Sequence, residues 1–157
     1  MIIDFKELGN IREKHREDKL VFCAGVFDLL HTGHLEHLKN SKEKGNVLVV
    51  AVSSDKRAKN LKGKNRPVHN QYMRVIMVDA VRHVDYAFIA PEPSDDASAE
   101  IPTVQILKIL KPDILVVSDP KGFDYTGYAK DLGVDLIKIS RSTLDSTTDI
   151  IERVKKI

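Results

Sequence analysis

The sequence predicts an α/β fold: a Rossmann-like, five-stranded parallel sheet with helices on both faces. Short apolar segments rich in valine, isoleucine and leucine alternate with amphipathic segments from end to end. The apolar segments are nearly continuous, which is typical of strands buried on both faces of a parallel sheet. With 157 residues, 42% of them hydrophobic and 31% charged, the chain has the size and composition of one globular domain. We therefore expect a single domain over residues 1–157.

The first half begins with a polar helix, Asp4–Lys19, whose apolar face carries Phe5, Leu8 and Ile11. Apolar runs then predict two strands, Leu20–Val26 and Asn46–Ser53, and helical spacing predicts a helix between them, Gly33–Lys44. The lysine-rich stretch Ala58–Pro67 is expected to be a loop. A helix over Asn70–Arg82 follows, with its core face formed by Met73, Ile76, Met77 and Ala80.

In the second half, prolines mark the boundaries. The strand Val84–Ala90 is closed by Pro91 and Pro93. Pro102 opens a helix over Thr103–Leu110, and Pro112 precedes a strand over Asp113–Ser118. The remaining elements are expected to be the helix Tyr125–Leu132, the strand Val134–Ser140 and the helix Ser146–Ile157. Ser146 with Asp149 forms a capping-box pattern at the start of the last helix.

One motif lies at the junction between the first predicted strand and the helix that follows it. Its sequence is Gly25-Val26-Phe27-Asp28-Leu29-Leu30-His31-Thr32-Gly33-His34. A helix N-terminus presents unpaired N–H groups and a partial positive charge, which suit a phosphate. Glycine lets the backbone approach a ligand closely, and the imidazoles of His31 and His34 can donate hydrogen bonds to phosphate oxygens. The motif therefore predicts a site for a nucleoside triphosphate.

Polar residues also follow the other strands. Ligands of such sheets bind beyond the carboxyl ends of the strands. The second, fourth and fifth strands end at Ser53-Ser54-Asp55, Ser118-Asp119 and Ser140-Arg141. These residues are expected to meet the histidine motif at one edge of the sheet.

Composition excludes several classes of protein. The formal net charge of +2 is too small to predict a nucleic-acid partner, and the apolar runs are too short to cross a bilayer. The single cysteine, Cys23, excludes an internal disulfide and favours a cytoplasmic location. His37 continues the histidine spacing, but zinc needs three or four ligands, so we expect no metal held by the protein. His37, His15, His69 and His83 are interpreted as ordinary structural or solvated residues.

The motif of residues 25–34 resembles the GxFDxxHxGH signature of the cytidylyltransferase-like nucleotidyltransferases, and most of all the adenylyltransferase domain of ADP-heptose synthases. The segment Leu61–Pro67 is similar to the LKGxxRP stretch of the same enzymes. Arg141–Thr148 is similar to the RTxGxSTT segment of glycerol-phosphate cytidylyltransferases. This resemblance implies a homodimeric enzyme that uses CTP or ATP. Magnesium carried by the nucleotide is expected from the chemistry of phosphate transfer.

The resemblance also implies roles for particular residues. His31, His34 and Lys59 would be catalytic, and Asp28, Lys59 and Arg74 would bind the phosphorylated substrate. The nucleotide would be bound by Gly25, Val26, Phe27, His31, Gly33, His34, Lys62, Asp119, Arg141, Ser146, Thr147 and Thr148. Arg74 could equally form a structural ion pair.

The chain departs from the heptose pattern after the fourth strand. ADP-heptose synthases have a Lys-Gly-Gly-Asp turn there, whereas this chain reads Val117-Ser118-Asp119-Pro120. Because the base should be read near the ends of the fourth and fifth strands, Asp119 and Arg141–Thr148 favour CTP slightly over ATP.

The sequence thus predicts transfer of a nucleotidyl group to a sugar or polyol phosphate, with release of pyrophosphate. Alternatives are another acceptor, such as FMN, nicotinamide mononucleotide or an alcohol phosphate, a nucleotide-binding module without turnover, and an RNA-binding relative of tRNA synthetases.

Overall fold

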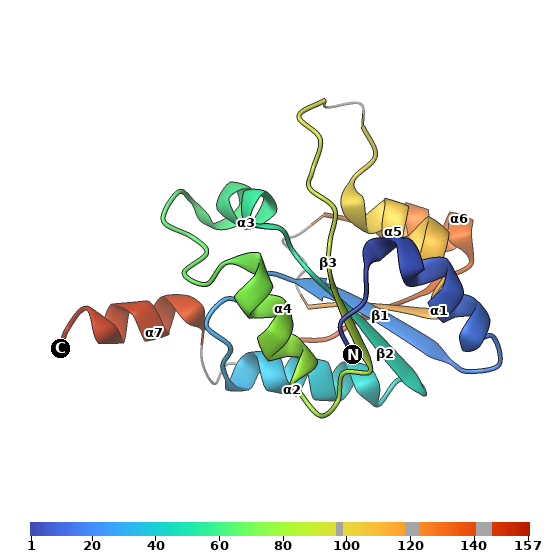
Figure 1. Ribbon diagram of the computed structural model, residues 1–157, viewed down its shortest axis with the longest axis horizontal. Coiled ribbons are helices and arrows are strands. Elements are labelled where there is room, and N and C mark those ends of the chain that lie inside the picture. The colour runs from blue at the N-terminus through green and yellow to red at the C-terminus, as the bar shows by residue number, and fades with distance from the viewer. Residues whose placement is uncertain (97–98, 119–122, 141–145) are drawn as a thin grey trace.

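The computed structural model describes residues 1–96, 99–118, 123–140 and 146–157. It confirms the predicted fold, because five parallel strands form one sheet in the order β3-β2-β1-β4-β5 (Figure 1). In chain order the strands are β1 (Leu20–Gly25), β2 (Val47–Val52), β3 (Tyr86–Ile89), β4 (Ile114–Val117) and β5 (Asp135–Lys138).

The central strand is β1, which is paired on both sides. It pairs with β2 from Leu20 opposite Val47 to Gly25 opposite Val52. On its other side Val21 lies opposite Ile114 of β4. The loop after β1 therefore leaves the middle of the sheet, with the ends of β2 and β4 beside it.

A short 3-10 helix, Phe5–Glu7, leads into the first α-helix. The α-helices are α1 (Leu8–Lys14), α2 (Thr32–Lys42), α3 (Asp55–Lys62), α4 (Gln71–Asp79), α5 (Pro102–Leu110), α6 (Thr126–Leu132) and α7 (Thr147–Val154). No described helix is long and apolar enough to span a bilayer.

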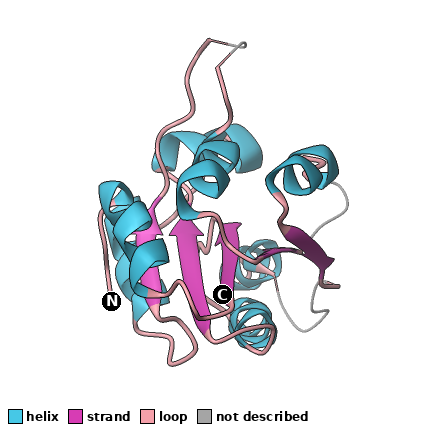
Figure 2. Cartoon of the chain, turned by 90° about the vertical axis from the view of Figure 1, so that its right-hand side faces the viewer, coloured by secondary structure: helices cyan, strands magenta, loops and turns pink. Residues whose placement is uncertain are grey.

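Two apolar cores lie on opposite faces of the sheet, since alternate residues of a strand point to opposite sides. On one face Phe22 packs with side chains of α1, α5 and α6. On the other face Cys23 packs with Leu38 of α2 and Val75 of α4. Helices accordingly lie on both sides of the strands (Figure 2), as the near-continuous apolar runs predict.

Three expectations about the helices are wrong. The leading helix ends at Lys14 and does not reach Lys19. The stretch expected as a loop from Ala58 is helical as far as Lys62, because Ser54 caps α3 by accepting a hydrogen bond from the Arg57 N–H at 3.2 Å.

The third correction concerns the inner face of α4. It consists of Arg74, Val75 and Val78, while Met73 and Ile76 are exposed. The periodic apolar residues thus form an outer stripe, and the inner face includes a buried charge that a search for apolar spacing passes over.

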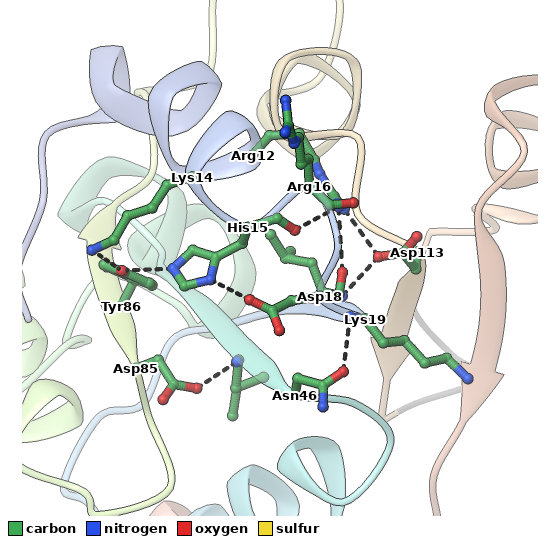
Figure 3. A network of polar contacts seen from close by, with 12 residues as sticks. Arg12, Lys14, His15, Arg16, Asp18, Lys19, Asn46, Asp85, Tyr86 and Asp113 are labelled. Carbon is green, nitrogen blue, oxygen red and sulfur yellow. Dashed lines mark hydrogen bonds and ion pairs between the residues drawn. The ribbon is translucent and has the colours of Figure 1, made fainter.

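A polar network fixes the amino-terminal ends of the strands (Figure 3). His15 bridges Asp18, at 2.7 Å from Nδ1, and the Tyr86 hydroxyl, at 2.9 Å from Nε2. Arg12 donates to Asp113 at 2.9 Å, and Asp113 also accepts the Leu20 N–H at 2.7 Å. The helix α1 is thereby joined to β1, β3 and β4 at the edge opposite the histidine motif.

Candidate active site

A pocket of about 600 Å³ opens at the carboxyl ends of the strands. It is lined by the loop after β1, by one side of α2, by α3, and by the N-terminus of α7. Ser53, Ser118 and Ser140, which follow β2, β4 and β5, also line it. These three serines, which belong to the polar residues that the sequence places at strand ends, are therefore brought together, and the volume suits a small ligand.

The turn between β1 and α2 has an unusual backbone. Phe27 and Leu29 are in the left-handed region, with φ angles of 51° and 48°. Bulky residues rarely adopt this conformation, so packing must offset its cost. The Phe27 ring is buried and lies edge-on to His34, with 5.4 Å between ring centroids. A Cβ added at Gly25 would come within 2.9 Å of the Phe27 ring, so the glycine makes room for this turn.

His31 and His34 lie against each other at the start of α2. Their ring centroids are 3.8 Å apart, and both side chains line the pocket. His31 is the residue before the first helical position, and its carbonyl accepts the His34 N–H at 2.9 Å. The N–H groups of Thr32 and Gly33 precede this bond in the first turn and have no acceptor within the helix, and the pair of imidazoles stands beside them.

A second helix N-terminus reaches the same pocket from the end of the chain. Ser146 and Asp149 form the predicted capping box, which confirms that expectation. Thr147 Oγ1 donates a hydrogen bond to the carbonyl of Asp28 at 2.7 Å and so ties α7 to the β1–α2 turn. Because Thr147 and Thr148 also line the pocket, both helix N-termini favour an anion at one place.

The carboxylate of Asp28 is buried and engaged within the protein. It accepts hydrogen bonds from Arg66 Nε at 2.7 Å and from the N–H groups of Val68 and His69 at 2.9–3.0 Å. Burial raises the pKa of Asp28, but the hydrogen bonds from His69, Val68 and Arg66 outweigh it, and the pKa lies below its usual value. Asp28 therefore stays charged and holds Arg66 at the pocket wall.

Arg74 lies below the pocket and is fully buried. Its Nε donates to the carbonyl of His69 at 2.9 Å, Nη1 to the carbonyl of Val26 at 2.6 Å, and Nη2 to Asp55 at 2.7 Å. It thus connects the end of β1, the start of α3 and the segment before α4. The structure places it as a structural ion pair, one of the two roles that the sequence leaves open.

The helix α3 presents a different set of cations from the one expected. Lys62 lines the pocket as predicted, whereas Lys59 is exposed and is not among the residues that line it. Arg57 lines the pocket instead, together with Arg66. The helix turns Arg57 and Lys62 toward the pocket while Lys59 points elsewhere.

The predicted site residues thus fall into three groups. Those that line the pocket are Gly25, Val26, Phe27, Asp28, His31, Gly33, His34, Lys62, Ser146, Thr147 and Thr148. Lys59 and Arg74 do not line it. Asp119 and Arg141 lie outside the described residues.

Sequence reasoning missed His37, Arg57 and Arg66 among the lining residues. Arg66 belongs to the LKGxxRP-like segment, so the resemblance offered a signal for it. Whether His37 and Arg57 line the pocket depends on how α2 and α3 are rotated against the sheet. No local sequence pattern reveals this rotation.

Over the described part of the chain, no three His, Cys, Asp or Glu side chains gather as ligands for a metal ion. The described residues of the pocket therefore do not form a metal cage of their own.

Comparisons with known proteins found a matching family model and similar sequences. A family model described as cytidylyltransferase-like matches residues 22–153. The chain is 38% identical, over 98% of its length, to the bifunctional protein HldE of a Nitratiruptor species, and 39% identical to that of Campylobacter fetus subsp. fetus. It spans about a third of the length of these curated relatives, 32% and 31% respectively.

Two solved structures share the fold. The lipopolysaccharide core biosynthesis protein from Thermoplasma volcanium superposes with a TM-score of 0.64 at 27% identity, covering 80% of this chain and 98% of that one. Pantoate-beta-alanine ligase from Francisella tularensis superposes with a TM-score of 0.61 at 19% identity, covering 100% of this chain and 78% of that one. The second likeness concerns the fold alone.

Proposed function

Because this chain belongs to the cytidylyltransferase-like family, we propose that it joins the nucleoside monophosphate part of CTP or ATP to a phosphorylated sugar or polyol. The observation that carries the proposal is the meeting of two helix N-termini and the paired imidazoles of His31 and His34 in one pocket. Such a site suits a polyphosphate, since helix N-termini and imidazole N–H groups all favour negative charge.

In the proposed reaction, an oxygen of the acceptor phosphate attacks the α-phosphorus of the nucleotide. A new P–O bond forms, and the bond from the α-phosphorus to the bridging oxygen of the β-phosphate breaks. Pyrophosphate leaves with that electron pair. Since the attacking oxygen is already anionic, the protein need not remove a proton, and its task is to align the reactants and stabilise the developing charge.

His31 and His34 would donate hydrogen bonds to the α- and β-phosphates, and Ser146, Thr147 and Thr148 would receive the remaining phosphate oxygens. This assignment follows from their places at the two helix N-termini that line the pocket. Magnesium brought by the nucleotide would be held by its phosphates rather than by a cage of described residues, and it would supply further positive charge. Asp119 and Arg141, expected to contact the nucleotide, stay predictions, as does the preference for CTP.

The acceptor would lie on the α3 side. Arg57, Lys62 and Arg66 are the described cations that line the pocket, and they form one wall of it. A phosphate group attached to an uncharged sugar would be held by this wall through charge-assisted hydrogen bonds. The structural neighbour from Thermoplasma is a lipopolysaccharide core biosynthesis protein, which supports a sugar phosphate as the acceptor.

Asp28 would act on the acceptor through Arg66, which it holds at 2.7 Å. Lys59, expected to be catalytic, does not line the pocket, whereas Arg57 of the same helix does. The two residues therefore form a matched pair for mutation on one helix.

We also propose that residues 1–157 act as one nucleotidyltransferase domain and that two copies associate. The outer stripe of α4 supports a dimer, because Tyr72, Met73 and Ile76 are 64%, 45% and 60% exposed. Light scattering at micromolar concentration tests this, and a monomer would contradict it.

The decisive experiment measures pyrophosphate release with CTP and with ATP, each offered with a panel of sugar and polyol phosphates. We expect turnover with one nucleotide and a narrow set of acceptors. Arg57→Ala should raise KM for the acceptor more than Lys59→Ala does. If the folded protein releases no pyrophosphate with any pair, the proposed function is wrong.

A further inference from the structure

The lining of the pocket is chemically uneven. Its described positive charges, Arg57, Lys62 and Arg66, all come from α3 and the loop after it. The far side is formed by α2 and the end of β5, and contributes Glu36, His37, Asn40, Ile139 and Ser140. In the sheet, β2, which precedes α3, and β5 lie on opposite sides of β1, while α2 follows β1 itself and packs against β1 and β2.

This far side suits an uncharged group with hydrogen-bonding edges better than it suits a phosphate. Ile139 provides an apolar wall, while His37 and Asn40 provide donors and acceptors. A ligand that is anionic at one end and neutral at the other would place its neutral end here. A nucleoside triphosphate has that character.

His37 carries the most specific signal on this side. Its Nδ1 is buried and has no hydrogen-bond partner among the described residues. A buried polar atom without a partner costs stability, and a ligand that pairs with it removes that cost. Burial also lowers the pKa of His37, so its ring is neutral near pH 7 and offers one donor and one acceptor nitrogen.

The position of His37 on α2 fits a planar ligand. Gly33 lies four residues before His37 and Asn40 three residues after it, so all three lie along one side of the helix. Gly33 has no side chain and leaves the first turn open beside the phosphate-binding histidines. A flat group lying against Gly33 would reach His37 one turn further along the helix.

We propose that His37, together with Asn40, reads the base of the nucleotide. The proposal rests on the proposed function and adds to it the side chains that select the base. The base would lie over Gly33 with its hydrogen-bonding edge toward His37, while its triphosphate stays at the two helix N-termini. The acceptor then occupies the α3 side without competing for the same groups.

The test compares ligands with and without a base. Calorimetric titration gives Kd values for ATP, CTP, GTP and UTP, and for inorganic tripolyphosphate, which contains only the phosphate part. The variant His37→Leu keeps bulk at this position but removes the ring nitrogens. His83→Ala is the matched control, since His83 lies in the α4–β3 connection and does not line the pocket.

With His37→Leu we expect the Kd of the preferred nucleoside triphosphate to rise about tenfold. The differences among the Kd values of the four nucleoside triphosphates should become smaller. The Kd of tripolyphosphate should equal its value for the unmodified protein. His83→Ala should change none of these values. If the leucine variant fails to fold, His37→Gln makes the same test, with an altered order of base preference as the expected result.

If His37→Leu leaves the differences among the Kd values of the four nucleotides unchanged, or weakens nucleotide and tripolyphosphate binding equally, the role of His37 alone is overturned. Failure of the unmodified protein to bind any of the four nucleotides would overturn the proposed function, and the base assignment with it. The two failures are therefore distinguishable.

Discussion

Replacement of Arg74 by methionine separates a structural role from a substrate contact. Arg74 is 0% exposed and donates to the carbonyls of Val26 and His69 and to the Asp55 carboxylate. Methionine has a similar length but no donor. The variant therefore leaves two partly buried carbonyls without this donor, each at a cost of about 1–3 kcal/mol. Asp55 is one-third exposed and can regain water, so it adds less.

The expected loss of unfolding free energy is about 3–5 kcal/mol, which is the range for removing one partner of a buried ion pair. Urea unfolding followed by circular dichroism measures it, with m-values compared to check for two-state behaviour. Arg82→Met is the control, because Arg82 is exposed and its side chain bonds its neighbour His83 rather than any distant segment. It should cost less than about 0.5 kcal/mol. A stable Arg74→Met protein with a raised KM for the acceptor would refute the structural role.

Three further results are expected. His31→Ala and His34→Ala should each lower kcat by about 10²–10³ without a large change in unfolding free energy, as for a lost preorganised donor, and near-normal turnover would contradict this. Asp28→Asn should destabilise the protein by about 1–3 kcal/mol at pH 7. Because the folded pKa of Asp28 lies below its usual 3.8, this stabilisation is complete above pH 3.8 and is lost as pH falls through the folded pKa. The urea midpoints of the unmodified protein and of Asp28→Asn should therefore converge in acid. If the difference between the two midpoints stays constant as pH falls, the charge of Asp28 is not the source of the stabilisation. Gly25→Ala should cost about 1–3 kcal/mol and lower kcat, since the new Cβ would meet the Phe27 ring at 2.9 Å, and unchanged activity would show that the ring can move freely.

Sequence reasoning succeeded where the signal is local. The strand, turn and helix around His31 depend on neighbouring residues, and so does the cap formed by Ser146. For α3 two local signals compete, because Ser54 is a capping residue that favours a helix while the lysines that follow favour a solvated loop. In the structure the cap prevails and the segment is helical.

The parts that sequence could not predict depend on tertiary placement. Arg74 is buried because three segments distant from one another present acceptors to it. Whether Arg57 or Lys59 lines the pocket depends on the rotation of α3 against the sheet, and His37 reaches the pocket for the same reason on α2. No spacing rule along one segment contains that information.

The strand order has a consequence for how such a chain can diversify. The cationic wall of the pocket is encoded by one continuous stretch, 55–66, whereas the opposite wall comes from α2 and the region after β5. An exchange of that single stretch between relatives, with Asp55 and Arg66 kept for their partners Arg74 and Asp28, would leave the phosphate-binding helix ends untouched. Under the proposed function, the choice of acceptor would then change with this stretch alone, while nucleotide binding would stay the same.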